Sequence, residues 1–187
     1  MVDLEFGLSV YNEQPLIHFV LGCTDRIWKR KGIHRLIHAN FVQEIQQYQQ
    51  ENLTKFLIWH ATLTPFVTRF VADFYMDVQP VDDKHGGYDP RYVPVIEQIQ
   101  KKMNWQLDDR RNMNKNKHPF VLYGISKNVF YTDEELERIQ QFKSNSKDRY
   151  NLFDRFQLDI RNGDRILYLS RVTDKKIEFI PNLDKNI

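Results

Sequence analysis

The chain has 187 residues, of which 41% are hydrophobic, 13% aromatic and 28% charged. This composition excludes a disordered protein, and the length suffices for one domain with a sizeable core. The formal net charge of +2 excludes a general attraction to nucleic acid or to membranes, so a nucleic-acid partner is not expected. No apolar run approaches the ~20 residues that span a bilayer, and the single cysteine excludes an internal disulfide. With no secretory signal at the N-terminus, these features predict a cytoplasmic protein without a membrane partner.

The chain opens with two predicted strands. Residues 6–11 alternate apolar and small side chains, and residues 16–21 form a short apolar run. The four residues between them, Asn12-Glu13-Gln14-Pro15, have turn composition. We therefore expect a β-hairpin.

A helix and a third strand follow. Apolar residues recur at helical spacing and predict a helix that reaches Tyr48: Ile33, Leu36, Ile37, Phe41, Ile45 and Tyr48. Residues 56–59 form a compact apolar run that continues to residue 62 and predicts a buried strand. A strand, a helix and a strand joined by short turns make a βαβ unit, whose two strands we expect to be neighbours.

The next helix is predicted from Thr64, which can cap it, and Pro65, which suits the first helical position. Its apolar stripe, which ends before Pro80, is interpreted as core: Phe66, Val67, Phe70, Val71, Phe74 and Tyr75. Residues 82–94 have loop composition, and residues 92–103 suggest another helix. Residues 108–117 are polar and mostly basic, which predicts an exposed loop, and residues 119–125 are expected to form a strand.

The C-terminal third contains a capping box, with Thr132 and Glu135 three residues apart ahead of an apolar helical pattern. A turn at residues 162–164 and strands at 165–172 and 177–180 complete the expected elements. We predict one α+β domain over residues 1–187. Its mixed, mostly antiparallel sheet is flanked by helices, and an inserted segment spans about 80–117.

The stretch from Gly22 to Arg35 joins the second strand to the first helix and is rich in cations. Lys29, Arg30, Lys31 and Arg35 crowd a turn that contains Gly32. The first N–H groups of a helix have no intrahelical partner and lie at the positive end of the helix dipole. The turn is thus a candidate phosphate site. The alternative is a solvated connection whose cations only confer solubility.

At this turn the sequence resembles the GNAT superfamily of N-acetyltransferases, whose pyrophosphate-binding motif is Arg/Gln-x-x-Gly-x-Gly/Ala at a strand-to-helix turn. The resemblance covers roughly residues 5–78. It implies that the turn holds the pyrophosphate of acetyl-CoA or a related acyl-CoA through Lys29, Arg30, Lys31, Gly32, Ile33, His34 and Arg35. Lys29 replaces the usual Arg or Gln, and His34 replaces a small residue. Val71 falls near the position of the tyrosine that often acts as the general acid.

The resemblance also implies direct transfer of an acetyl group to an amine, with a base for the amine and an acid for the departing thiolate. His60, near the end of the predicted strand, is the candidate base, and Tyr75, one turn beyond Val71, is the candidate acid. The alternative is that His60 is a histidine satisfied within the core or at its rim. The alternative function is a non-catalytic binding protein that uses a GNAT-like fold to hold a protein or nucleic-acid partner.

Other residue patterns leave further alternatives open. His34 and His38 have the i, i+4 spacing of a two-histidine metal site, for which His60 could be a third ligand, or they are ordinary surface histidines. Cys23 is a candidate nucleophile or a small buried residue. Residues 82–84 suggest nuclease carboxylates with a lysine, or a loop. The basic residues 110–117, near Trp105, suggest a nucleic-acid contact or a solvated loop.

Overall fold

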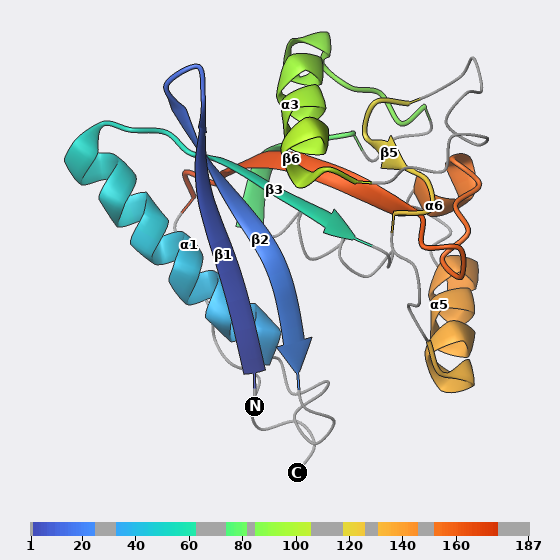
Figure 1. The fold of residues 1–187 in the computed structure, drawn as a ribbon. Coiled ribbons are helices and arrows are strands. Elements are labelled where there is room, and N and C mark those ends of the chain that lie inside the picture. The colour runs from blue at the N-terminus through green and yellow to red at the C-terminus, as the bar shows by residue number, and fades with distance from the viewer. Residues whose placement is uncertain are drawn as a thin grey trace. The chain divides into compact units, whose positions relative to one another are not determined.

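The structure is a computed structural model, and it describes residues 2–24, 33–62, 74–81, 85–105, 118–125, 131–145 and 152–175. It is an α+β fold with a mostly antiparallel, open sheet, as the sequence predicts (Figure 1). The strand order is β1-β2-β3-β6-β4, and β5 pairs with β6. Within the described ranges, no helix combines the length and the apolar character needed to cross a bilayer.

The elements have the following bounds. The strands are β1 (Val2–Tyr11), β2 (Gln14–Thr24), β3 (Leu57–Thr62), β4 (Tyr75–Gln79), β5 (Val121–Leu122) and β6 (Arg165–Val172). The helices are α1 (Ile33–Asn52), α3 (Val93–Met103), α5 (Asp133–Asn145), α6 (Leu152–Arg155) and the short 3₁₀ helix η2 (Pro90–Tyr92).

The chain divides into two compact units. Unit 1 comprises Met1–His60, Phe70–Asp77 and Leu169–Ile187, and unit 2 comprises Ala61–Arg69 and Val78–Tyr168. The boundaries between the units fall within β3, β4 and β6, each of which has residues in both units. The single-domain organisation over residues 1–187 stays a prediction.

The predicted hairpin is confirmed in unit 1. β1 pairs antiparallel with β2 from Val2↔Thr24 to Tyr11↔Gln14, so both strands are longer than the sequence pattern indicates. The connecting residues Asn12 and Glu13 have φ values of 45° and 67°. Two left-handed residues form the turn whose twist matches the right-handed twist of the flanking strands.

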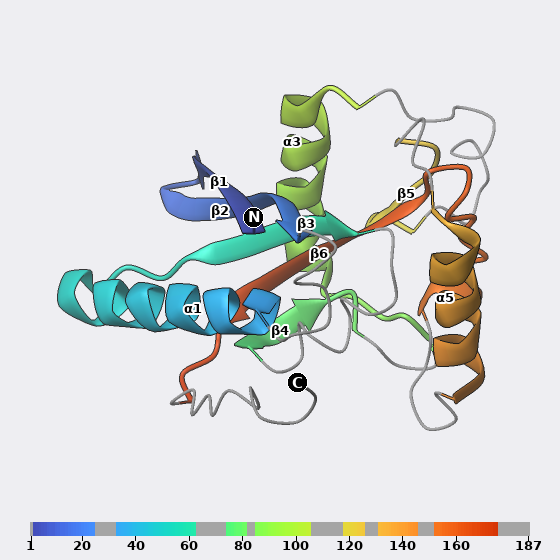
Figure 2. The same ribbon diagram turned by 90° about the horizontal axis from the view of Figure 1, so that it is seen from below.

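The predicted βαβ unit is also confirmed. β2 and β3 are parallel neighbours, and α1 is the crossover between them (Figure 2). The buried residues of α1 recur at helical spacing and are His38, Ala39, Val42 and Ile45. The predicted helix to Tyr48 is confirmed and continues to Asn52, although Tyr48 itself is 50% exposed. The C-terminal half of the helix therefore buries Ile45 but leaves Tyr48 half exposed.

The helix predicted from Thr64 ends earlier than its apolar pattern. Residues 63–73 lie outside the described part, and Phe74 is still helical, but Tyr75–Gln79 form β4. The Thr173 N–H, just after β6, donates to the Phe74 carbonyl over 3.3 Å. The prediction that Tyr75 continues a helix is wrong because pairing with a distant strand outweighs a local apolar period.

Unit 2 contains the remaining helices. The predicted helix at 92–103 is confirmed as α3, which η2 precedes, but the strand predicted over 119–125 shrinks to β5, Val121–Leu122. The capping box before α5 is confirmed, because the Thr132 N–H donates to Glu135 Oε2 over 3.0 Å and the Glu135 N–H to Thr132 Oγ1 over 3.3 Å. The predicted turn and strand at 162–172 are confirmed as well. The expected loop at 108–117 and strand at 177–180 lie outside the described residues.

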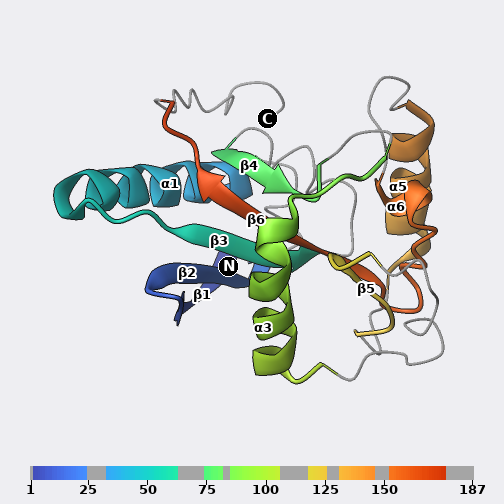
Figure 3. The same cartoon turned by 90° about the horizontal axis from the view of Figure 1, so that it is seen from above.

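A hydrophobic cluster forms the core of unit 2 along β5, β6, α5 and α6. Figure 3 shows the ribbon of these elements. Its buried members are Val121, Ile139, Leu152, Phe153, Leu158, Ile160, Ile166 and Tyr168. The Asp164 carboxylate is fully buried beside this cluster and accepts from the Gly124 N–H over 3.0 Å and from the Asp159 N–H over 2.7 Å. One side chain thus holds two loops together through their backbones.

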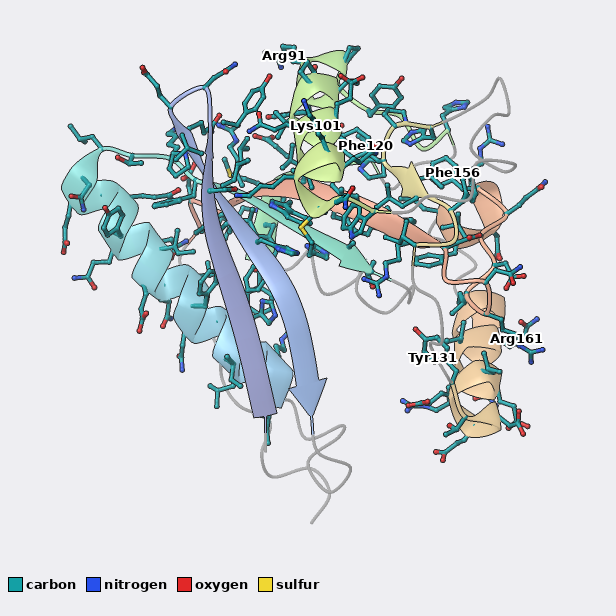
Figure 4. All side chains as sticks on the ribbon, viewed as in Figure 1. Arg91, Lys101, Phe120, Tyr131, Phe156 and Arg161 are labelled. Atoms are coloured by element: carbon teal, nitrogen blue, oxygen red, sulfur yellow. The ribbon has the colours of Figure 1, made fainter. Side chains whose placement is uncertain are left out.

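His118 has a similar role in unit 2. Its Nδ1 accepts from the Phe120 N–H over 3.3 Å, so its ring proton is on Nε2, which donates to the Gly86 carbonyl over 2.7 Å. Burial lowers the pKa of His118, although the bond to Gly86 opposes that change. The ring centroids of Phe120 and Phe156 lie 5.9 Å and 4.5 Å from that of its imidazole. Figure 4 labels these two phenylalanines.

Candidate functional site

The candidate site is where β2 departs from β3. The two strands pair in parallel at Leu16↔Leu57, Ile17↔Ile58 and His18↔Trp59, and the ladder ends there. The imidazole of His18 stacks on the indole of Trp59 with ring centroids 3.4 Å apart. The described pairings of β2 with β3 end at this pair, and β2 runs on to Thr24 while it still pairs with β1.

A bulge in β2 lies directly after this last pair. In the ladder with β1, Glu5 pairs with Leu21 and Phe6 with Phe19, so the register skips Val20. An extra residue in one strand bends that strand and increases its twist. The bulge is therefore the local cause of the departure of β2 from the line of β3 (Figure 1).

The predicted phosphate turn lies between this bend and α1. The described residues do not include the cations and the glycine of this turn, which are Lys29, Arg30, Lys31 and Gly32. The described chain resumes at Ile33, which is half-buried and begins α1, with His34 in the same turn. The first turn of α1 contains no acidic residue, so no carboxylate there competes with an anion for the helix N-terminus.

Arg35 is held over an aromatic ring. Its guanidinium carbon lies 5.4 Å from the centroid of Phe74, and the arginine is exposed. An exposed cation–π contact is worth about 0.5–1 kcal/mol, which restricts the side chain without removing its charge from solvent. Arg35 therefore keeps a cation near the start of α1.

Tyr75 makes a buried hydrogen bond with a residue of α1. Its hydroxyl lies 3.1 Å from His38 Nδ1, and the two residues are 5% and 8% exposed. Burial raises the pKa of Tyr75 above its ordinary value, so the phenol keeps its proton at neutral pH. The candidate acid is thus a protonated hydroxyl that a histidine holds in place.

The ring of Phe19, the first residue of β2 beyond the last β3 pair, lies against this hydrogen-bonded pair. Ring centroids are 4.7 Å apart to His38, 4.8 Å to Phe41 and 6.3 Å to Tyr75. We call these four residues, together with Phe74, the Phe19 cluster: Phe19, His38, Phe41, Phe74 and Tyr75. The cluster places a polar pair beside the residue at which β2 leaves β3.

His60 directly follows Trp59 in β3, at the edge of the same region. Burial, and secondarily the charge of His18, lower the pKa of His60 to about 4. The imidazole is therefore neutral at pH 7, which a base requires. A pKa this far below neutrality also makes it a weak proton acceptor.

The described part of the chain brings none of the other residues singled out from the sequence into a common site. His38 bonds to Tyr75, and the described residues contain no group of three His, Cys, Asp or Glu side chains that could hold a metal ion. Cys23 pairs with Asp3 in the hairpin, with its side chain outside the described part. Residues 82–84 and 110–117 are outside it as well, whereas Trp105 is half-buried.

The sequence reasoning missed the bond between His38 and Tyr75. A signal for it was present, because His38 stands four and seven residues before Val42 and Ile45, the spacing of one buried helix face. A histidine on such a face needs a hydrogen-bond partner. The sequence does not identify that partner, which is 37 residues away.

Compared with known proteins, the chain has no match: no family model, no curated protein sequence and no solved structure matches it. The function proposed below is argued from the geometry of the βαβ unit and from the residues of the basic turn.

Proposed function

We propose that this chain is a GNAT-like N-acyltransferase of the cytoplasm that binds acetyl-CoA, or a related acyl-CoA, and moves the acyl group to an amine. The observation that carries the proposal is the departure of β2 from β3 immediately before the basic turn and α1. An edge of β2 and the N-terminus of α1 thus follow each other along the chain.

The two ends of coenzyme A suit these two features. Its diphosphate is an anion that the helix N-terminus and the cations Lys29, Arg30, Lys31 and Arg35 would attract. Its pantetheine arm carries amide groups, which can hydrogen-bond to a strand edge as an added strand does. The edge of β2 after Phe19 has no β3 partner among the described pairings. The thioester would then lie toward the Phe19 cluster.

In the proposed reaction the amine nitrogen attacks the thioester carbonyl, the C–N bond forms and the C–S bond breaks. His60 takes the proton that the amine loses, and Tyr75 gives a proton to the departing thiolate. Both groups start in the required state at pH 7, since His60 is neutral and Tyr75 is protonated. Their pKa values lie on opposite sides of neutrality, which lowers the driving force for each transfer.

That same mismatch favours a second candidate, a non-catalytic protein that holds a protein or nucleic-acid partner on the same fold. A pKa of about 4 at the half-buried His60 and a raised pKa at the buried Tyr75 are also what two residues without an acid–base role would have. The two candidates differ in whether the chain binds acyl-CoA and turns it over.

Binding is tested by thermal melts with acetyl-CoA, plain coenzyme A, and a short DNA duplex at two salt concentrations. A ligand present at 100 times its Kd stabilises the folded state by about 2.7 kcal/mol, so we expect a clear rise in Tm with both coenzymes. Gly32→Glu, which places bulk and negative charge in the basic turn, should abolish that rise. Gln50→Glu, which adds the same charge at an exposed position of α1, should leave it intact.

No rise in Tm with either coenzyme at millimolar concentration would refute the proposal, and a salt-sensitive rise with DNA alone would favour the second candidate. Turnover is followed by thiol release from acetyl-CoA in the presence of a panel of amines. Loss of an acid or a base costs about 10²–10⁴-fold, so Tyr75→Phe and His60→Gln should show losses of this size. Tyr48→Phe, on the exposed face of α1, is the matched control.

A further inference from the structure

The two ends of the described sheet differ in how they are protected. An exposed strand edge is a template for another strand, and proteins blunt such edges with short strands, prolines, lysines or local distortions. β4, at one end, has five residues, a left-handed Asp77 with φ 52° that is ion-paired to Arg171, and Pro80 directly after it. β1, at the other end, has ten residues and contains no proline, lysine or arginine.

β1 is also regular along its outer side. The bulge in the hairpin is an extra residue of β2, so Glu5 and Phe6 remain consecutive in β1 and its alternation is unbroken. Positions of even number therefore share one face of the strand and positions of odd number the other. The even positions are all apolar, Val2, Leu4, Phe6, Leu8 and Val10, and the odd positions are Asp3, Glu5, Gly7, Ser9 and Tyr11.

This pattern is symmetric about Phe6. If two antiparallel copies of β1 pair with Phe6 opposite Phe6, then Leu4 stands opposite Leu8 and Val2 opposite Val10. On the other face Asp3 stands opposite Ser9 and Glu5 opposite Gly7, so no two carboxylates face each other. Like charges directly opposite would be destabilising, and this register avoids them.

We propose that two copies of this chain associate through β1, antiparallel and about a twofold axis at Phe6, so that two sheets join into one. A twofold interface must be self-complementary, and the symmetric order of apolar and charged residues meets that requirement. A slip of one residue would set the apolar face of one strand against the polar face of the other, which disfavours that register. The partner is a second copy, because the order of apolar and acidic residues along β1 is complementary to its own reverse. The proposal does not depend on the proposed function.

The first test is the mass of the wild-type chain by light scattering and sedimentation from about 1 to 200 µM. We expect a concentration-dependent rise from 22.6 kDa toward twice that mass. Hydrogen exchange at the β1 amides should slow at the concentrations where the mass doubles. A mass of 22.6 kDa at every concentration, or a dimer whose β1 amides exchange at the monomer rate, overturns the proposal.

The register is tested by a charge pair. Ser9→Asp sets a carboxylate opposite Asp3 of the second copy at two symmetric places, and should weaken the dimer by about 2- to 30-fold. Adding Asp3→Lys in the same chain should restore the dimer, because each new carboxylate then faces an ammonium. Gln50→Asp, with the same net charge change on α1, should have no effect. Circular dichroism confirms that each variant is folded, and a dimer insensitive to Ser9→Asp contradicts the β1 register.

Discussion

The buried Tyr75–His38 pair of unit 1 differs in its kind of partner from Asp164 and His118 of unit 2, and from Ser170 of unit 1, which bonds to a backbone carbonyl. In unit 1 the hydroxyl of Tyr75 and the imidazole of His38 bond to each other, side chain to side chain, between β4 and α1. In unit 2 Asp164 and His118 bond to backbone groups of loops, at Gly124, Asp159, Gly86 and Phe120. A ligand can replace one side chain of a side-chain pair while the backbone stays in place. A side chain that bonds to loop backbone cannot move away without opening the loop. The difference is a physical reason to place a ligand site in unit 1.

The largest expected effect is in unit 2. Asp164→Ala removes the fully buried carboxylate to which the Gly124 and Asp159 N–H groups donate. The loss of two hydrogen bonds to a charged group should cost about 3–5 kcal/mol of unfolding free energy. Urea denaturation measures the loss, and the exposed Asp174→Ala is the control. A loss below 1 kcal/mol would mean that the carboxylate does not organise these loops, and the contrast between the units would fail.

The next effect is a pH dependence in unit 1. The pKa of His60 is lowered to about 4 when folded, against about 6.5 when unfolded, so the unfolded chain binds more protons between these values. Stability is therefore full above pH 6.5 and falls as pH decreases to 4, by up to about 3 kcal/mol. Denaturation of the wild type and of His60→Gln at pH 7 and pH 4 measures it. The variant should lose less stability on acidification, and equal losses would contradict the burial of His60.

A conformational effect in unit 2 is expected at Gly86, which has φ +63°. A Cβ there would lie 2.5 Å from Phe156 Cζ. Gly86→Ala should cost about 2 kcal/mol, from the left-handed backbone and the displaced ring. Gly7→Ala is the matched control, because its nearest neighbour would be His18 Cβ at an ordinary 3.6 Å. Thermal melts of both variants check this, and equal Tm values would refute the account.

In unit 1 Tyr75→Phe removes the hydroxyl and leaves His38 Nδ1 without that partner, at a cost of about 1–2 kcal/mol. Tyr48→Phe should be neutral. In a double-mutant cycle with His38→Phe the two losses should not add, since both remove one interaction. Additive losses would show that the two side chains act independently.

The smallest effect is a gain. Leu53 follows the last residue of α1, has a left-handed backbone with φ 53° and is 93% exposed. Its side chain therefore contributes little packing energy to offset the cost of that backbone conformation. Leu53→Gly should raise the free energy of unfolding by about 0.5–1 kcal/mol. Asn104→Gly, at the left-handed end of α3, should gain less because asparagine already tolerates that conformation. Denaturant midpoints of the two variants rank them, and a loss at Leu53→Gly would contradict this account.

The hairpin, α1 and β3 could be predicted from sequence because each depends on a local pattern: turn residues, a helical period or a short apolar run. The strand at Tyr75 could not be predicted, because Phe74 and Tyr75 also fit the apolar period of the preceding helix. Residues 75–79 form a strand because the chain pairs there with a distant segment near Thr173. The bend at Val20 was equally hidden, since a bulge depends on the register of two strands. For the candidate site, residue types were predictable, but the partner of His38 and the lowered pKa of His60 depend on packing between distant segments.

The place of β6 in the sheet has a consequence for synthesis of the chain. β6 comes last among the described strands but stands between β3 and β4 in the strand order, and Ser170 Oγ bonds to the Ile58 carbonyl over 3.4 Å across 112 residues. At ~5–20 residues per second, a ribosome needs roughly 5–20 s to proceed from the end of β3 to β6. Throughout that interval the nascent β3 has an open edge that its own partner cannot yet cover. The N-terminal βαβ unit is thus a natural client for chaperones that shield exposed strands during translation.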